Sequence, residues 1–215
     1  MWLFVLLIAF LTVGFLVRYS MLQKVDVSVS EELQEMSVPG LDQAMILISY
    51  AGSAITLILL ACTLAGMLAY RRHFRTAVFV LLSLLSLPLD YLLKAIWERD
   101  RPDAELVHVV VKQAGYSFPS GHALGSTAVY GLLSVLAWIH LKKHKVRHPV
   151  VVTLATLPVL ICISRVYLGA HWFSDVIGGM TLGIVVILAL TSFYREDKEE
   201  VARPIDPSTD AAPQV

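Results

Sequence analysis

Six apolar segments, each long enough to cross a bilayer as a helix, dominate this chain of 215 residues. A bilayer core about 30 Å thick needs roughly 20 residues of helix, and every backbone polar group inside it must be satisfied within the protein. Only 16% of the residues are charged, against about 25% in soluble domains. The sequence therefore predicts an all-α, polytopic membrane protein with six transmembrane helices in a bundle, over residues 2–21, 44–70, 76–97, 123–141, 149–168 and 176–194.

The basic residues give these segments an orientation. Six spans place both termini on one side, and that side would carry ten of the 17 Lys and Arg residues, against seven on the other. Positive charge stays cytoplasmic, so we expect both termini in the cytoplasm. Residues 2–21 lack a basic start and a small-residue cleavage site, which favours an uncleaved span over a signal peptide.

Two segments outside the spans complete the organisation. Residues 24–41 are acidic and dotted with apolar side chains, which is compatible with either a short interfacial helix or a solvated loop. Residues 196–215 are charged and then rich in Pro, Asp and Ala, a composition typical of disorder. We expect a membrane domain over residues 1–195 and a disordered cytoplasmic tail over residues 196–215. The net charge of zero gives no reason to expect nucleic acid as a partner, and no obligate protein partner is evident.

The first of three polar clusters lies at the outer end of the third span. Lys94 and Arg101 are seven residues apart, and Pro102 fixes the exit of the chain. Arg can bind a phosphoryl group through two donors, whereas Lys contributes a point charge. Either residue alone could equally be an interfacial anchor. Asp90, one turn before Lys94, could hold the ammonium toward a site or simply neutralise it.

The second cluster, Ser120-Gly121-His122, opens the fourth span. Ser is a favoured N-cap, and Gly lets the backbone approach a ligand closely. The first turn of a helix presents unpaired N–H groups and a partial positive charge, which together favour an anion. A lone His at a membrane edge is usually only an interfacial residue, but this one follows Pro-Ser-Gly at a predicted anion site. We therefore expect His122 to lie beside a bound phosphoryl group.

The third cluster lies around the turn between the fifth and sixth spans. His171 and Asp175 are four residues apart, so they share one helix face. A carboxylate that accepts from Nδ1 leaves Nε2 unprotonated and basic, which makes the imidazole a base or a nucleophile. Arg165, at the end of the fifth span, would complete an anion pocket. Cations, helix-start amides, two imidazoles and a carboxylate are what phosphoryl transfer without a metal requires.

Together, these clusters resemble the three signature motifs of the type 2 phosphatidic acid phosphatase superfamily in residue type, spacing and order. The resemblance implies that His171 attacks phosphorus and forms a phospho-histidine, that Asp175 orients it, and that His122 protonates the departing oxygen and then activates water. It implies that the phosphoryl oxygens are bound by five residues: Lys94, Arg101, Ser120, Gly121 and Arg165. No metal or other cofactor is implied, because three cations supply the charge stabilisation.

The predicted function is accordingly a membrane lipid phosphatase or diphosphatase with its site at the outer membrane surface. A lipid head group would reach that site while its tails remain in the bilayer. Compact members of this kind act on phosphatidylglycerol phosphate, undecaprenyl diphosphate, phosphatidate or diacylglycerol diphosphate, and the sequence does not choose among them. Two alternatives are a lipid or anion transporter that retains the pocket and a vanadate-dependent peroxidase.

Overall fold

The computed structural model describes residues 2–142 and 144–202, and these form helices joined by turns and one long connecting segment. The elements are α1 (Trp2–Arg18), α2 (Gln23–Glu35), α3 (Leu41–Ala51), α4 (Ala54–Tyr70), α5 (Phe74–Leu82), the 3-10 turn η1 (Ser83–Leu85), α6 (Ser86–Trp97), α7 (Gly121–His140), α8 (Arg147–Tyr167) and α9 (Phe173–Ala202). The all-helical class predicted from the sequence is confirmed.

The number of spans depends on how two bent helix pairs are counted. Four stretches are long and apolar enough to cross a membrane: Phe74–Trp97, Gly121–His140, Arg147–Tyr167 and Phe173–Tyr194. The pair α1 and α2 is bent by 94°, and the pair α3 and α4 by 47°, so there are up to six spans if each pair is one. The third span continues through Pro88 to Trp97, as predicted, with η1 one turn before the proline.

The second span differs from the prediction of one continuous helix over residues 44–70. The chain breaks at Gly52 and Ser53, and Ser53 adopts an extended conformation with φ −68° and ψ 147°. Its hydroxyl accepts a hydrogen bond of 3.2 Å from the backbone N–H of Thr56. A Ser that caps a new helix stabilises the break. The cap was not predicted from the sequence, because the apolar run continues on both sides of it.

The acidic segment after the first span is a helix rather than a solvated loop. It forms α2, which begins after a turn and leaves α1 at close to a right angle. Gln34 near its end ties α2 to the rest of the protein: Nε2 donates to the backbone carbonyls of His108 and Tyr167, at 2.7 and 2.9 Å. If α1 crosses the bilayer, this bend directs α2 along the membrane plane.

Helix α7 is the central helix of the bundle. In its most apolar stretch of 18 residues, 67% of the residues are buried inside the protein, against 33–39% in the corresponding stretch of the other three continuous spans. It packs against α8 and α9, and the crossing with α9 is close because of Gly179. A Cβ at that position would lie 2.6 Å from the backbone oxygen of Ser120. The contact brings the first turns of α7 and α9 together.

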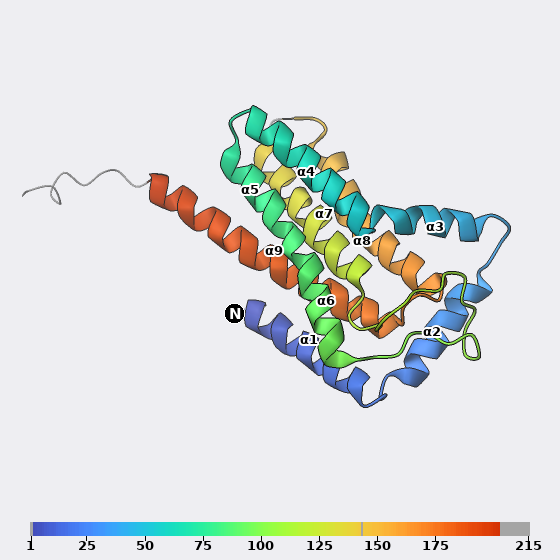
Figure 1. The fold of residues 1–215 in the computed structure, drawn as a ribbon. Helices are drawn as coiled ribbons and strands as arrows, with labels where there is room; N and C mark the ends of the chain where they lie inside the picture. Colours follow the sequence, from blue (N-terminus) through green and yellow to red (C-terminus); the bar gives the residue numbers. More distant parts are fainter. Residues whose placement is uncertain (1, 143, 203–215) are drawn as a thin grey trace, which may run out of the picture.

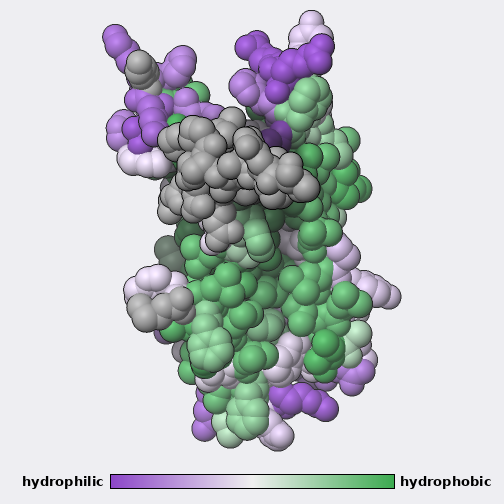
Figure 2. Space-filling view, turned by 90° about the vertical axis from the view of Figure 1, so that its left-hand side faces the viewer, coloured by the Kyte–Doolittle hydropathy of each residue, from purple (hydrophilic) through white to green (hydrophobic). Residues whose placement is uncertain are grey.

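Figure 1 shows which connections lie at each end of the bundle. Helix α2, the long 98–120 segment and the α8–α9 turn lie at that end, while the α4–α5 and α7–α8 connections lie at the other. Figure 2 shows an apolar belt over the middle of the visible face, with hydrophilic residues gathered at both ends. Helix α9 continues to Ala202; the rest of the predicted disordered tail, residues 203–215, lies outside the described residues.

Candidate active site

The three sequence clusters meet at one end of the bundle around a small cavity. Lys94 lies in the last turn of α6, Gly121 and His122 begin α7, and His171 lies in the turn before α9. All four line a cavity of about 250 Å³. The two histidines thus face one space, although they are 49 positions apart in the sequence.

His171 is fully buried, and its contacts fix its tautomer. Nη1 of Arg101 lies 3.3 Å from Nε2. A guanidinium has donors only, so Nε2 must be the acceptor and the ring proton must be on Nδ1. The predicted form of His171, with a bare Nε2, therefore follows from the arrangement of its neighbours.

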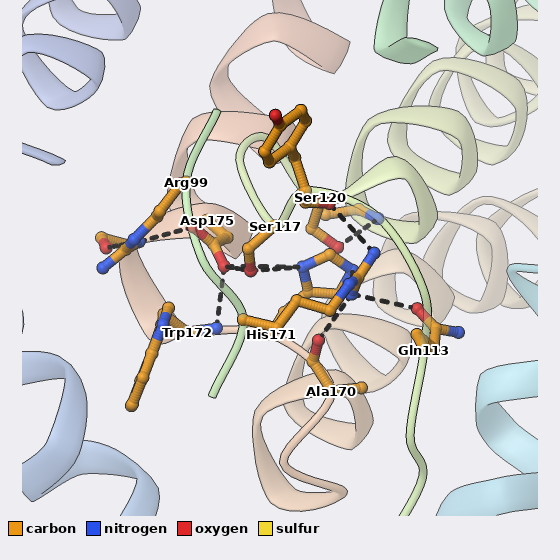
Figure 3. Close-up of polar contacts among 12 residues, drawn as sticks. Arg99, Gln113, Ser117, Ser120, Ala170, His171, Trp172 and Asp175 are labelled. Atoms are coloured by element: carbon orange, nitrogen blue, oxygen red, sulfur yellow. Dashed lines mark hydrogen bonds and ion pairs between the residues drawn. The ribbon is translucent and has the colours of Figure 1, made fainter. Parts of the chain in front are cut away.

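On its other side His171 meets a hydroxyl as well as the predicted carboxylate. Nδ1 lies 3.4 Å from the hydroxyl oxygen of Ser117 and 3.5 Å from Oδ2 of Asp175. The Ser117 hydroxyl also forms a short hydrogen bond to Oδ2 of Asp175. Figure 3 shows this hydroxyl between the ring of His171 and the carboxylate of Asp175. The sequence predicted the pairing of His171 with Asp175 but missed Ser117.

Asp175 is held from several directions. Its Oδ2 accepts a hydrogen bond of 2.9 Å from the backbone N–H of Trp172, and its Oδ1 accepts one of 2.5 Å from Nη1 of Arg99. Its backbone carbonyl accepts from the N–H of Ser120 at 3.0 Å. This last bond joins the start of α9 directly to the start of α7, so the residue that carries the carboxylate is connected to the helix terminus.

The start of α7 has the geometry of an N-terminal anion site. Ser120 precedes the helix in an extended conformation, and its hydroxyl accepts from the N–H of Ala123 at 3.5 Å, as an N-cap does. Gly121 is the first helical residue, and a Cβ there would lie 2.5 Å from Oδ2 of Asp90. A larger residue at this turn would therefore displace the carboxylate of Asp90, which α6 places close to the start of α7.

Two cations whose charges act on His171, Lys94 and Arg165, are held in different ways, and of the two only Lys94 is among the residues described as lining the cavity. Nζ of Lys94 forms an ion pair of 2.7 Å with Oδ2 of Asp90, whereas the second oxygen of Asp90 is buried and has no hydrogen-bond partner in the part of the chain that the structure describes. The side chain of Arg165 is 2% exposed, and Nη1 donates to the hydroxyl of Ser49 in α3 at 2.6 Å. Its Nε and Nη2 are buried and have no hydrogen-bond partner among the described residues.

These cations act on His171. Burial lowers the pKa of His171 well below its ordinary value, and the positive charges of Arg165, Arg101 and Lys94 lower it further. Burial likewise lowers the pKa of Arg101. A neutral imidazole with a bare Nε2 is the form in which histidine is a nucleophile.

Several residues of the site gave no signal in the sequence. Asp26 and Ser49 come from α2 and α3, far from the motifs, and Arg99 lies inside the first cluster without a predicted role. Gln113, in the long 98–120 segment, lines the cavity and accepts from Nη1 of Arg101 at 3.2 Å. Within the described residues, no group of three or more His, Cys, Asp or Glu side chains could hold a metal ion.

Comparisons with known sequences identify the family of this chain. A sequence model of the PAP2 superfamily matches residues 77–199. Phosphatidylglycerophosphatase B of Bacillus subtilis (strain 168) is 33% identical over 198 residues, which are 90% of this chain and 95% of that protein. Undecaprenyl-diphosphatase BcrC of the same strain is 31% identical over 149 residues, 68% of this chain and 71% of that protein.

Solved structures show the same fold. The transmembrane PAP2 type phosphatidylglycerolphosphate phosphatase from Bacillus subtilis superposes with a TM-score of 0.81 at 28% identity, covering 95% of this chain and 98% of that chain. Aquifex aeolicus LpxE shares the fold with a TM-score of 0.62 at 22% identity, covering 78% of this chain and 95% of that chain. With a family match over more than half of its length and a relative that aligns almost end to end, this chain belongs to the PAP2 superfamily.

Proposed function

We propose that this protein is a membrane lipid phosphatase that hydrolyses phosphate mono- or diphosphate esters of lipids through a phospho-histidine. The single observation that carries the proposal is the cavity shared by His122 and His171, with Lys94 on its wall and Arg101 in contact with His171. Membership of the PAP2 superfamily and the names of the relatives point to the same reaction class.

In the first step Nε2 of His171 attacks phosphorus, and the bond from phosphorus to the lipid oxygen breaks. The departing oxygen takes its proton from His122, whose protonated form is stabilised by the negative charge of the bound phosphoryl group. The positive charge that develops on His171 is stabilised by Asp175, with the hydroxyl of Ser117 contacting both groups.

In the second step water attacks the phospho-histidine. His122, now neutral, accepts a proton from the water, the P–N bond breaks, and its electron pair returns to Nε2 of His171. Phosphate leaves, and both imidazoles are restored to their starting protonation states.

Charge stabilisation comes from the side chains around the cavity. A buried donor without a partner costs about 1–3 kcal/mol, and more when it is charged. Within the described ranges, Nε and Nη2 of Arg165 are two such donors, which supports a role in binding phosphoryl oxygens. Lys94, Arg101, Ser120 and the first N–H groups of α7 supply further positive charge and donors.

The surroundings of the cavity favour a lipid substrate. Besides the polar residues, it is lined by Gly52 and Ala54 at the break between α3 and α4, and by Leu87 of α6. A head group could enter from the bilayer along these apolar elements while its tails stay in lipid. Phosphatidylglycerol phosphate and undecaprenyl diphosphate are the first candidates, because the similar enzymes are named for them.

The orientation of the site follows from the charge distribution. In the six-span topology expected from the sequence, ten of the 17 basic residues fall on the side of both termini, and the positive-inside rule favours a cytoplasmic location for that side. The cavity then faces the extracytoplasmic side. A cysteine introduced at exposed Lys112 should react with an impermeant thiol reagent added to intact cells or right-side-out vesicles.

The decisive experiment measures phosphate release by the detergent-purified protein from phosphatidylglycerol phosphate, undecaprenyl diphosphate, phosphatidate and diacylglycerol diphosphate. We expect release from at least one of these lipids, and EDTA should not change it. His171→Ala should abolish release. The matched control His108→Ala, at an exposed position of the 98–120 segment, should retain it. Release that survives His171→Ala, or that EDTA removes, would contradict the mechanism. Lipid movement without hydrolysis, or halide oxidation with vanadate and peroxide, would favour the alternatives instead.

A further inference from the structure

Arg99 connects two buried carboxylates that are 149 residues apart in the sequence. Its Nη1 donates to Oδ1 of Asp175 and its Nη2 donates to Oδ2 of Asp26, both at 2.5 Å. Asp175 and Asp26 are fully buried, and the side chain of Arg99 is 8% exposed. Figure 3 shows Arg99 on the side of Asp175 that faces away from His171.

Ser174 closes this arrangement. Its backbone N–H donates to Oδ1 of Asp26 at 2.8 Å, its hydroxyl donates to Oδ2 of Asp26 at 2.7 Å, and the same hydroxyl accepts from Nη1 of Arg99 at 2.7 Å. Every charged group of the set therefore has an opposite charge and further hydrogen bonds. A planar guanidinium that bridges two acceptors has little freedom to rotate.

We propose that Arg99 and Asp26 are positioning residues: Asp26 of α2 holds Arg99, Arg99 holds Asp175, and Asp175 thereby keeps His171 in the orientation for attack. This inference rests on the proposed function and deepens it. Helix α2, which lies outside the part of the chain matched by the family model, becomes part of the support of the site.

Charge explains why the second carboxylate matters. A single Arg facing Asp175 alone would neutralise it and weaken it as the partner of the imidazolium that forms on His171. With Asp26 present, one guanidinium is shared by two carboxylates, so the set keeps a net negative charge beside His171. Asp26 therefore holds Arg99 in place and also limits how strongly Arg99 neutralises Asp175.

A purely structural ion pair would have the same distances, so the test must separate the two roles. The measurement is kcat and KM for the lipid that the wild-type protein hydrolyses, in Asp26→Asn, Arg99→Lys and Asp175→Asn and in the double variant Asp26→Asn/Asp175→Asn. We expect Asp26→Asn and Arg99→Lys each to lower kcat about 10- to 100-fold, the range typical of residues that orient a functional histidine. KM should change little, because the pair does not touch the substrate.

The double variant gives the sharper result. If Asp26 acts through Asp175, Asp26→Asn should lower kcat by less than about 3-fold once Asp175 is already Asn, because residues that act as a unit are non-additive. Effects that multiply in the double variant, or an unchanged kcat in both single variants, would overturn the proposal. If Asp26→Asn does not fold, Ser174→Ala takes its place and is combined with Asp175→Asn in the same way. Effects on kcat that multiply in that double variant would again overturn the proposal.

Two controls change α2 without touching Arg99. Glu31→Gln removes an exposed charge from this helix, and Gln34→Ala removes the hydrogen bonds to His108 and Tyr167. Both should keep kcat within about 3-fold of wild type, even where Gln34→Ala lowers the Tm. If the wild-type protein releases no phosphate, the proposed function itself is refuted. If the enzyme is active and depends on His171 but Asp26→Asn and Arg99→Lys leave kcat unchanged, only this inference is refuted.

Discussion

The guanidinium of Arg101 lies 3.3 Å from Nε2 of His171, the nitrogen that attacks phosphorus in the proposed mechanism. The same side chain donates to the backbone carbonyls of Gly115, Tyr116 and Ala170 at 2.9, 3.0 and 2.8 Å. Arg101 therefore fixes the long 98–120 segment against the α8–α9 turn and presents charge at the point of attack.

Replacement of Arg101 by Lys tests this double role. Lys keeps the charge but cannot form the fork of hydrogen bonds, and the loss of one preorganised donor at a developing charge costs about 10²- to 10³-fold in kcat. We expect Arg101→Lys to lower kcat by about that factor, measured as phosphate release. Lys112→Ala, which alters an exposed cation of the same segment, is the control; a near-normal rate in Arg101→Lys would show that charge alone is sufficient.

The hydroxyl of Ser117 gives a second prediction. Hydrogen bonds to charged groups contribute about 1.5–3 kcal/mol. The hydroxyl of Ser117 donates to the carboxylate of Asp175 and lies 3.4 Å from Nδ1 of His171. Ser117→Ala should therefore lower kcat roughly 10- to 100-fold with KM nearly constant. Ser126→Ala is a matched control, because that buried hydroxyl donates to a carbonyl of its own helix. Equal rates in the two variants would contradict a role for Ser117 in orienting the catalytic pair.

The lowered pKa of His171 predicts the position of the acidic limb of the pH–rate profile. Attack needs the neutral imidazole, which persists until the pH falls through the lowered pKa, so the limb should lie below the ordinary histidine value of 6.5. Lys94 is one of the charges that lower this pKa. Lys94→Met should therefore move the limb to higher pH, besides weakening substrate binding.

The profile is measured as kcat/KM against pH for both proteins with one lipid. A phosphate monoester itself titrates near pH 6, but this contribution is common to both proteins and cancels in the comparison. A limb that stays in place in Lys94→Met, or that moves to lower pH, would mean that Lys94 does not influence the attacking group.

Much of this architecture was predictable because membrane burial and phosphoryl chemistry both leave strong patterns. Long apolar runs predict spans, and the residues that bind or react with phosphate gather where those runs end. Lys94, His122 and His171 were therefore predicted from type and spacing, and they do line one cavity. Their chemical roles remain predictions that the variants above test.

The missed features depend on contacts that no local pattern records. Asp26 is an ordinary acid within an acidic segment, and Ser49 is an ordinary small residue within an apolar run; each becomes significant only because the chain folds back onto Arg99 or Arg165. The break at Gly52 and Ser53 was missed because hydropathy averages over such short signals. The sequence did not decide between a helix and a solvated loop for residues 24–41, because their composition suits both.

Two glycines allow packing and catalysis to be separated. At Gly179 a Cβ would lie 2.6 Å from the backbone oxygen of Ser120, which the α7–α9 contact holds in place. At Gly121 a Cβ would lie 2.5 Å from Oδ2 of Asp90, the end of a side chain that is paired with Lys94. Backbone resists displacement more than the end of a side chain does, so the two substitutions should have different consequences.

Gly179→Ala should therefore lower stability by about 1–3 kcal/mol, as overpacking does, and appear as a lower Tm of the purified protein in detergent. Gly121→Ala should leave the Tm nearly unchanged but raise KM, because Asp90 must turn away and Lys94 loses the partner that holds it at the cavity. Gly66→Ala adds a Cβ that, among the described residues, meets no atom of another element within 4 Å; it should leave KM unchanged and should not lower the Tm, because Ala is favoured over Gly inside a helix. If Gly121→Ala lowers the Tm as much as Gly179→Ala does, the turn at Gly121 serves packing rather than the alignment of Lys94.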